Sequence, residues 1–312
     1  MNRYKNRIKI LYVFAFFAVF TYIVNIFIPM DKNVVKTNST KNDIYIETYL
    51  LSEDHLLIPI SIPTEKESIN EMIVKMFSYM NGEKIMKGLN PLLEQSSKIN
   101  HVEVKENILY LYFDVLEYKE KNELKVLEAL SWLCTQFEDV KQVKLFLKEK
   151  ELTHMPYANT PIPNILNRDL GINNFENNGT ELHKTKTVTL YYTKEINDIS
   201  YYIPISKRIN QNEKIENLKY LDEISITSSL SSPFIEDHIK VLKVVKDQNK
   251  IKVTVSKQIL NENKEVNKVA YTLLVLSINE IYQNVDVEVY VGDVDISLTM
   301  NDLDIIINKF IL

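Results

Sequence analysis

The sequence predicts an α+β protein made of two tandem copies of one small unit, preceded by a single N-terminal membrane helix. Three observations support this prediction. The motif Ile-Pro-Ile-Ser occurs at residues 58–61 and again at 203–206, the same order of strands and helices surrounds both occurrences, and one long apolar segment lies near the N-terminus. A chain of 312 residues is long enough for two domains of common size.

The N-terminal segment has the features of a membrane anchor. Residues 1–9 contain four basic and no acidic residues, and the mostly apolar run 10–30 would span about 30 Å as a helix, the thickness of a bilayer core. Basic flanks stay in the cytoplasm, so we expect a cytoplasmic tail at 1–9, a polar stalk at 31–43 and an extracytoplasmic remainder. A cleaved signal peptide and a buried core helix are the alternatives, although the run is long for a signal peptide and lacks a small-x-small cleavage site.

The composition excludes several classes of function. The chain has only five glycines, too few and too scattered for a P-loop, a dinucleotide-binding loop or a nucleophile elbow. The net charge is −5, and without the four basic residues of the tail it becomes −9, which disfavours nucleic-acid binding. Cys134 is the single cysteine, so an intrachain disulfide is impossible, and its apolar neighbours predict a buried thiol.

The first repeat begins with two predicted strands, at 44–51 and 56–62. A helix follows over 69–80, where apolar residues recur at the i, i+3, i+4, i+7 spacing of one helix face. A hairpin turns at 105–107 and returns through 109–113, and a second helix spans about 122–138. A last strand at 143–148 alternates apolar and polar residues.

The second repeat shows the same order. Strands are predicted at 188–192 and around the second Ile-Pro-Ile-Ser motif, then a shorter helix at 213–223, a hairpin turning at 247–249, a helix over 266–281 and a strand at 287–291. The offset between the repeats drifts from about 139 in the second helix to 144 in the last strand, which predicts an insertion of about five residues near 277–284. Tandem duplication explains this parallel best.

Each repeat must hide the apolar side of its strands and helices. The simplest arrangement is one mixed or antiparallel sheet with two helices on one face, in the order ββαββαβ. We place the first domain at 44–152 and the second at 187–300. The Pro-containing segment 153–186 is interpreted as a linker, and 301–312 as a short C-terminal helix capped by Asn301 or Asp302.

These residues resemble the GerM domain, found in exported or membrane-anchored proteins of spore-forming bacteria. The most specific segment is Ala-Leu-Ser-Trp-Leu-Cys-Thr-Gln-Phe at 129–137, running into Val140-x-x-Val143, which is similar to the family's helix end and strand entry. Tyr271-Thr272-Leu273 keeps the helix core of that pattern in the second repeat, and Leu170-Gly171-Ile172-Asn173 is similar to the family's Gly-Ile-Asn element. The family's usual Gly-Pro after the first helix is replaced by Gly82-Glu83.

The resemblance implies the fold of the ring-building motifs of sporulation channel proteins and a non-enzymatic role. The protein would be an assembly or adaptor protein in sporulation or spore germination, acting outside the cytoplasm at the cell membrane through protein–protein contacts. Its partners would be other sporulation envelope or membrane proteins, with further copies of the chain left open. An envelope module that binds a ligand or peptidoglycan is the alternative, and an enzyme of unknown type a more distant one.

The sequence offers little chemistry. No two histidines have the spacing of a metal-binding pair on a helix. The histidines of the sequence are His55, His101, His154, His183 and His238. The acidic pairs Asp293-x-Asp295 and Asp302-x-Asp304 miss the spacing of a calcium loop and suit a turn and a helix start better. We therefore assign no catalytic, cofactor-binding or metal-binding residue and no cofactor.

Overall fold

A computed structural model describes residues 44–84, 86–174, 184–212, 221, 229–282, 285–292, 294–299 and 308–309. Residues Asp43–Leu312 belong to one compact unit. None of the helices within the described ranges is both long and apolar enough to cross a membrane. The predicted cytoplasmic tail, membrane helix and stalk lie outside these ranges, so they stay predictions.

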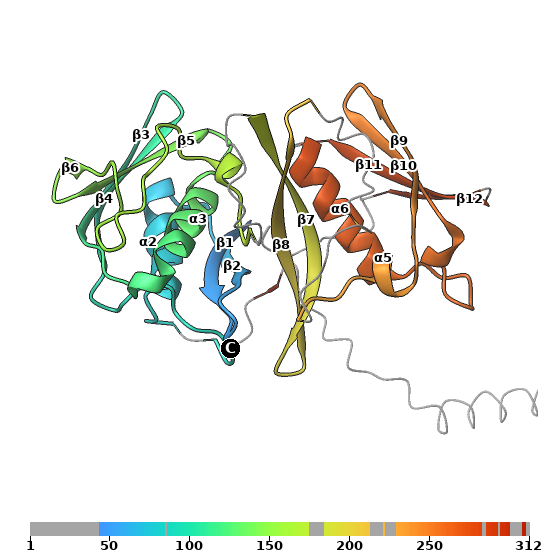
Figure 1. The fold of residues 1–312 in the computed structure, drawn as a ribbon, viewed down its shortest axis with the longest axis horizontal. Coiled ribbons are helices and arrows are strands. Elements are labelled where there is room, and N and C mark those ends of the chain that lie inside the picture. Colours follow the sequence, from blue (N-terminus) through green and yellow to red (C-terminus); the bar gives the residue numbers. More distant parts are fainter. Residues whose placement is uncertain are drawn as a thin grey trace, which may run out of the picture. The chain divides into compact units, whose positions relative to one another are not determined.

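The first repeat follows the predicted order of elements, shown in blue to green in Figure 1. Its strands and helices are β1 (Ile44–Leu51), β2 (Leu57–Thr64), α2 (Ile69–Met80), β3 (Lys98–Lys105), β4 (Ile108–Val115), α3 (Glu123–Cys134), β5 (Gln142–Leu147) and β6 (Lys150–Glu151). Ser68 caps α2 with a full capping box, since its hydroxyl accepts from the Glu71 N–H and the Glu71 carboxylate accepts from the Ser68 N–H.

The second repeat contains β7 (Thr185–Ile196), β8 (Ile199–Asn210), α5 (Pro233–Glu236), β9 (Val241–Asp247), β10 (Lys250–Val255), α6 (Lys268–Tyr282), β11 (Asp286–Val291) and β12 (Val294–Thr299). Of the helix predicted at 213–223, only Leu221 is described, and it is helical. Of the predicted helix at 301–312, only Asn308 and Lys309 are described. They form a turn and a bridge to Ser61 instead of helix.

The prediction of one sheet per repeat was wrong. The first repeat has two sheets: the hairpin β1–β2, and a four-stranded sheet in the order β3–β4–β5–β6, with β4 and β5 parallel. Helices α2 and α3 lie between them (Figure 1). The second repeat likewise separates β7–β8 from β9–β12. The reason is burial. Seven of the eight residues of β2 are buried, so the hairpin β1–β2 is covered on both faces. It therefore does not extend the four-stranded sheet, which has one solvent-exposed face.

The predicted insertion near 277–284 was also wrong. Nine consecutive buried residues, 126–134 in α3 and 270–278 in α6, correspond at an offset of 144. The last strands correspond at the same offset, because Val143 and Val287 hold the same register against β4 and β10. The comparison of the two repeats in sequence misaligned their second helices, because an apolar helix can be matched to another one in several registers with similar apolar patterns. The chain therefore connects helix and last strand in the same number of residues in both repeats.

The two Ile-Pro-Ile-Ser motifs lie side by side, in β2 and β8. Alternate residues of each strand point their backbone groups toward the other hairpin. At the middle of each facing edge stands a proline, Pro59 or Pro204, which has no N–H to donate. The two hairpins therefore stay separate sheets, and we call the boundary between them the seam.

Two asparagine side chains replace the missing donors across the seam. Asn173 accepts from the Leu57 N–H (2.8 Å) and donates to the carbonyls of Leu57 (2.8 Å) and Pro204 (3.1 Å). Asn308 accepts from the Tyr202 N–H (2.7 Å) and donates to the carbonyls of Tyr202 (2.9 Å) and Pro59 (2.7 Å). Leu57 and Tyr202, like the two prolines, are 145 residues apart, so the two asparagines make the same bonds on opposite repeats.

The segment interpreted as a linker is packed against both repeats. Gly171 (φ 85°) approaches β8 so closely that a Cβ there would lie 2.9 Å from the Ser206 Cβ. Its carbonyl accepts from the Trp132 indole N–H (3.2 Å), and the next residue, Ile172, exchanges hydrogen bonds with Ser206. Glycine is needed here because a side chain would push the segment off the strand. Residues 171–173 of the connection are thus part of the core.

Glu123, at the start of α3, fixes another part of this segment. Its carboxylate is 2% exposed and accepts from the backbone N–H groups of Tyr157, Ala158 and Thr160 (2.9–3.0 Å) and from the Tyr118 hydroxyl (2.8 Å). Burial alone would raise the pKa of Glu123, but these hydrogen bonds to the charged form lower it to about 2. A single carboxylate therefore holds the loop that follows β6.

We predict that Glu123→Gln lowers the free energy of unfolding by about 2 kcal/mol at pH 7, because an amide accepts these bonds less strongly than a carboxylate. The folded pKa is depressed, so the contribution of Glu123 is fully present above its unfolded pKa and is lost as the pH falls toward about 2. Urea unfolding of the variant should therefore depend less on pH between about 4.5 and 2. The exposed Glu262→Gln is the control and should match the parent chain; equal pH profiles for all three would contradict this role.

Candidate functional site: the groove between the repeats

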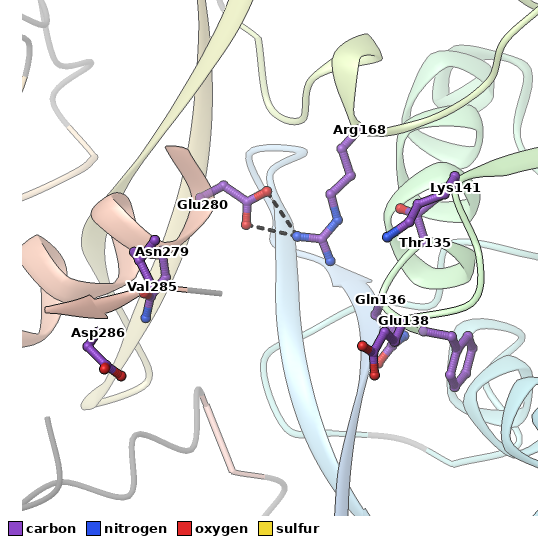
Figure 2. Close-up of a pocket in the computed structure, with 10 residues that line it drawn as sticks. Thr135, Gln136, Glu138, Lys141, Arg168, Asn279, Glu280, Val285 and Asp286 are labelled. Atoms are coloured by element: carbon purple, nitrogen blue, oxygen red, sulfur yellow. Dashed lines mark hydrogen bonds and ion pairs between the residues drawn. The ribbon is translucent and has the colours of Figure 1, made fainter. Parts of the chain in front are cut away.

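A groove with a volume of about 770 Å³ separates the α3 end of the first repeat from the α6 end of the second. Figure 2 shows it between these two helix ends, with Arg168 reaching in from the connecting segment. Its lining is mostly polar and charged: Thr135, Gln136, Phe137, Glu138, Lys141, Arg168, Asn279, Glu280, Val285 and Asp286. Glu138, Lys141 and Asp286 are exposed and available to a ligand or partner.

The groove is built from the same segment of both repeats. At the offset of 144, Thr135 corresponds to Asn279 and Gln136 to Glu280. The walls are the residues that follow α3 and the last turn of α6 with the residues after it, and Arg168 of the connecting segment completes the lining. The repeats differ in what these residues do. Gln136 bonds the Glu47 backbone, accepting from its N–H (2.7 Å) and donating to its carbonyl (2.9 Å), so it covers the edge of β1.

Glu280 binds Arg168 instead. Both carboxylate oxygens accept from Nη1, at 2.9 and 2.8 Å, and the pair is only partly exposed. The guanidinium also lies over the Trp132 ring, 4.5 Å from its centroid. Burial alone would lower the pKa of Arg168, but Glu280 and Glu47 raise it, so the guanidinium stays charged. Arg168 thus connects α3, the connecting segment and α6.

Two buried tyrosines lie near this ion pair. Tyr49 in β1 and Tyr191 in β7 pair with Pro59 and Pro204 of the partner strands, so they occupy the same position in the two repeats. Burial and the nearby carboxylates raise the pKa of both phenols well above the usual value. Partial burial likewise raises the pKa of Glu47. The Tyr49 hydroxyl donates to the Glu47 carboxylate (3.4 Å), so this pair is bonded inside the first repeat and is not part of the groove lining.

A second surface stands out on the first repeat. On the sheet face opposite the helices, His101, Tyr112 and Phe146 form a stacked row across β3, β4 and β5, with ring centroids 4.1 and 4.6 Å apart. Tyr110 lies beside Phe146 at 6.1 Å. All four rings are partly exposed. We call these four residues the aromatic face.

The same positions of the second repeat are mostly polar. The cross-strand row that corresponds to His101, Tyr112 and Phe146 is Lys243, Thr254 and Tyr290, and Lys252 corresponds to Tyr110. The fold therefore does not require an aromatic row at this place. Partly exposed aromatic residues that the fold does not need indicate a contact surface.

The histidines singled out in the sequence are dispersed in the structure. His55 lies in a turn (φ 62°) with Nε2 3.1 Å from Lys121 Nζ, His101 belongs to the aromatic face, and His154 and His238 are exposed. His183 lies outside the described residues. Across the described part of the chain, no group of three or more His, Cys, Asp or Glu residues is arranged to hold a metal ion.

The cysteine and the acidic residues singled out in the sequence add no further site among the described residues. Cys134 is fully buried, as predicted, and burial raises the pKa of its thiol. Asp293, Asp302 and Asp304 lie outside the described residues, and the side chain of Asp295 is not described.

Sequence reasoning missed the groove and the seam. Arg168 and Glu280 are 112 residues apart and belong to no motif. A signal did exist for the seam: the Ile-Asn of the Gly-Ile-Asn element recurs as Ile307-Asn308, at the end of the second repeat.

We predict that Arg168→Met and Glu280→Gln each lower the free energy of unfolding by about 2 kcal/mol, and that the double variant loses less than the sum, with a coupling energy of about 1–2 kcal/mol. Glutamine is the residue at the corresponding position of the first repeat, so Glu280→Gln suits the local fold. Urea denaturation of the four chains measures the coupling. The more exposed pair Lys144–Glu151 is the matched control and should couple by less than about 0.5 kcal/mol. Additive losses at Arg168 and Glu280 would contradict the link.

Comparison with known proteins finds one curated relative at the sequence level. No family model matches the chain. The spore germination protein GerM of Bacillus subtilis (strain 168) is 26% identical over 219 residues, which covers 68% of this chain and 60% of that protein. The chain thus matches less than two thirds of the length of this curated relative.

Solved structures agree. The tandem GerMN domains of the sporulation protein GerM from Bacillus subtilis match with a TM-score of 0.68 and 26% identity, covering 80% of this chain and 92% of that one. The first GerMN domain of the same protein matches 40% of this chain and 98% of its own, with 26% identity and a TM-score of 0.37. The repeated fold and the similarity to the tandem GerMN domains support the resemblance to the GerM domain family, with two domains in tandem.

Proposed function

We propose that the chain is a non-enzymatic assembly protein of sporulation or spore germination, anchored in the cell membrane by residues 10–30 and working outside the cytoplasm through protein–protein contacts. The names of its relatives connect the family with sporulation and germination. The anchor and the orientation rest on the apolar run and the basic tail of the sequence.

The observation that supports a contact role most directly is the aromatic face. Its four rings are partly exposed and span three strands, and three of the four have non-aromatic, polar counterparts in the second repeat. Aromatic residues are enriched where proteins bind one another, because they bury a large area at small entropic cost. The first repeat would bind the partner protein, while the second positions it.

The strand edges complement this surface. The edges of β2 and β8 are closed by the asparagines of the seam, and that of β1 is partly covered by Gln136. β3 and β9 each stand at the end of their sheet and contain an irregular register next to the free edge. Such bulges discourage indiscriminate strand pairing, so we assign partner binding to the face and not to the edges.

A substitution that borrows residues from the second repeat tests this role. We expect the double variant His101→Lys, Tyr112→Thr to fold normally, because the second repeat has these residues at the corresponding positions, and to lose function when it replaces the parent gene. The reciprocal variant Lys243→His, Thr254→Tyr is the control and should keep function. The measurement is the number of heat-resistant, germinating spores formed by strains carrying each chain.

Two results would contradict the proposal. Normal sporulation and germination of a strain without the gene would contradict the role in these processes. Full function of the double variant His101→Lys, Tyr112→Thr would show that the aromatic face does not carry the role.

A ligand-binding envelope module is the second candidate, because the volume of the groove lies in the range of ligand sites. Its exposed charges, Glu138, Lys141 and Asp286, would then recognise a polar ligand such as a peptidoglycan fragment. Glu138→Ala with Lys141→Ala separates the two candidates: it should abolish binding to purified cell wall if the groove is the site, and leave spore formation unchanged if the aromatic face is.

A further inference from the structure

An amine, a carboxylate and an amide meet where α3 contacts the segment that joins the repeats. Lys125 Nζ donates to the Glu128 carboxylate (3.0 Å) and to the side-chain oxygen of Asn173 (3.3 Å). The same oxygen of Glu128 accepts from the backbone N–H of Asn173 (3.1 Å). Asn173 is 1% exposed and Glu128 2% exposed, so the three groups touch one another largely out of contact with water.

The second repeat builds the corresponding helix without this ion pair. At the offset of 144, Lys125 corresponds to Val269 and Glu128 to Thr272 of α6. A buried ion pair gains little over uncharged residues of similar size, because removing both charges from water costs free energy. The pair is thus specific to the first repeat, where it contacts the amide of Asn173.

The carboxylate beside Lys125 supplies what an amine needs to act as a nucleophile. A lysine attacks only after it has lost a proton, and a general base within hydrogen-bonding distance takes that proton. Burial raises the pKa of Glu128 despite the opposing effect of Lys125, so this carboxylate accepts a proton more readily than an exposed one. Glu128 is therefore suited to be the base.

The amide of Asn173 is held in one orientation by the strands. Its oxygen accepts from the Leu57 N–H (2.8 Å), and its nitrogen donates to the carbonyls of Leu57 (2.8 Å) and Pro204 (3.1 Å). When a nucleophile adds to an amide carbon, negative charge develops on the amide oxygen, and a backbone N–H bonded to that oxygen stabilises the charge. The Leu57 N–H thus assists an attack on Asn173.

We propose that Lys125 and Asn173 become joined by an isopeptide bond, with Glu128 as the general base. Lys125 Nζ forms a bond to Cγ of Asn173, and the bond between Cγ and Nδ2 breaks. Two protons pass from Nζ through the Glu128 carboxylate to Nδ2, which leaves as ammonium. Nothing is oxidised or reduced, and Glu128 ends as it began. The new amide nitrogen keeps one N–H for the carbonyls of the seam.

The bond ties α3 covalently to the segment between the repeats. It restrains the unfolded chain as a disulfide does. Cys134 is the single cysteine of the chain, so an intrachain disulfide cannot supply such a link. The inference is independent of the proposed function, because it concerns how the first repeat is held and not what the protein binds.

Mass spectrometry of the full chain, purified in detergent micelles and then denatured, tests the proposal. The cross-linked chain is lighter than its sequence mass by one ammonia molecule, about 17 Da. Trypsin should release residues 122–141 and 169–184 as one branched peptide, because the enzyme does not cleave after a modified Lys125. Lys125→Ala and Asn173→Ala should each have their full sequence mass. Glu128→Gln should lower the cross-linked fraction at least about tenfold.

The exposed Lys121→Ala is the matched control, one helical turn before Lys125, and should keep both the mass deficit and the branched peptide. A parent chain of full sequence mass overturns the proposal, whatever the substitutions do to folding. A deficit with 122–141 and 169–184 released as separate peptides overturns it too, since an asparagine also loses ammonia when it closes on its own backbone. Cross-linking of Glu128→Gln at the level of the parent chain would overturn the role of Glu128.

Discussion

The arrangement of the two repeats depends on a missing hydrogen-bond donor. Two strands with free edges would ordinarily pair into one sheet, but Pro59 and Pro204 stand where the central N–H groups would be. Buried carbonyls without partners cost free energy, so the contact needs donors from elsewhere. Asn173 and Asn308 provide them, each bonding both strands. The repeated motif thus explains both why the hairpins stay separate and why they still adhere.

Features shared by the two repeats come from the duplication, and features found in one repeat alone come from later divergence. The seam and the groove both arise from equivalent segments of the two repeats. Symmetry is broken by Glu280, which binds Arg168 where Gln136 covers a strand edge, and by the aromatic face, whose counterpart is mostly polar. Positions that differ between the repeats on an equivalent backbone show where one repeat has a contact of its own, as Glu280 has with Arg168. The partly exposed ones among them, such as those of the aromatic face, are the places to look for function.

The sequence predicted local structure well and tertiary structure poorly. The order of elements, the hairpin turns and the burial of Cys134 follow from periodicity and composition. The separate hairpins did not, because the sequence pattern of a strand did not show that both of its faces are buried. β6 was too short to predict, and the groove joins Arg168 to a residue 112 positions away. The Ile-Asn at 307–308 was visible in the sequence, but its meaning depends on knowing that Asn173 bridges two strands.

Calorimetry of a fragment spanning residues 43–312 tests most directly whether the seam makes the two repeats one cooperative structure. The account predicts one unfolding transition in which the van't Hoff and calorimetric enthalpies agree, near about 190 kcal/mol for about 270 residues at 60 °C. Two resolved transitions, or a van't Hoff enthalpy close to half the calorimetric value, would show that the repeats unfold independently and would contradict it.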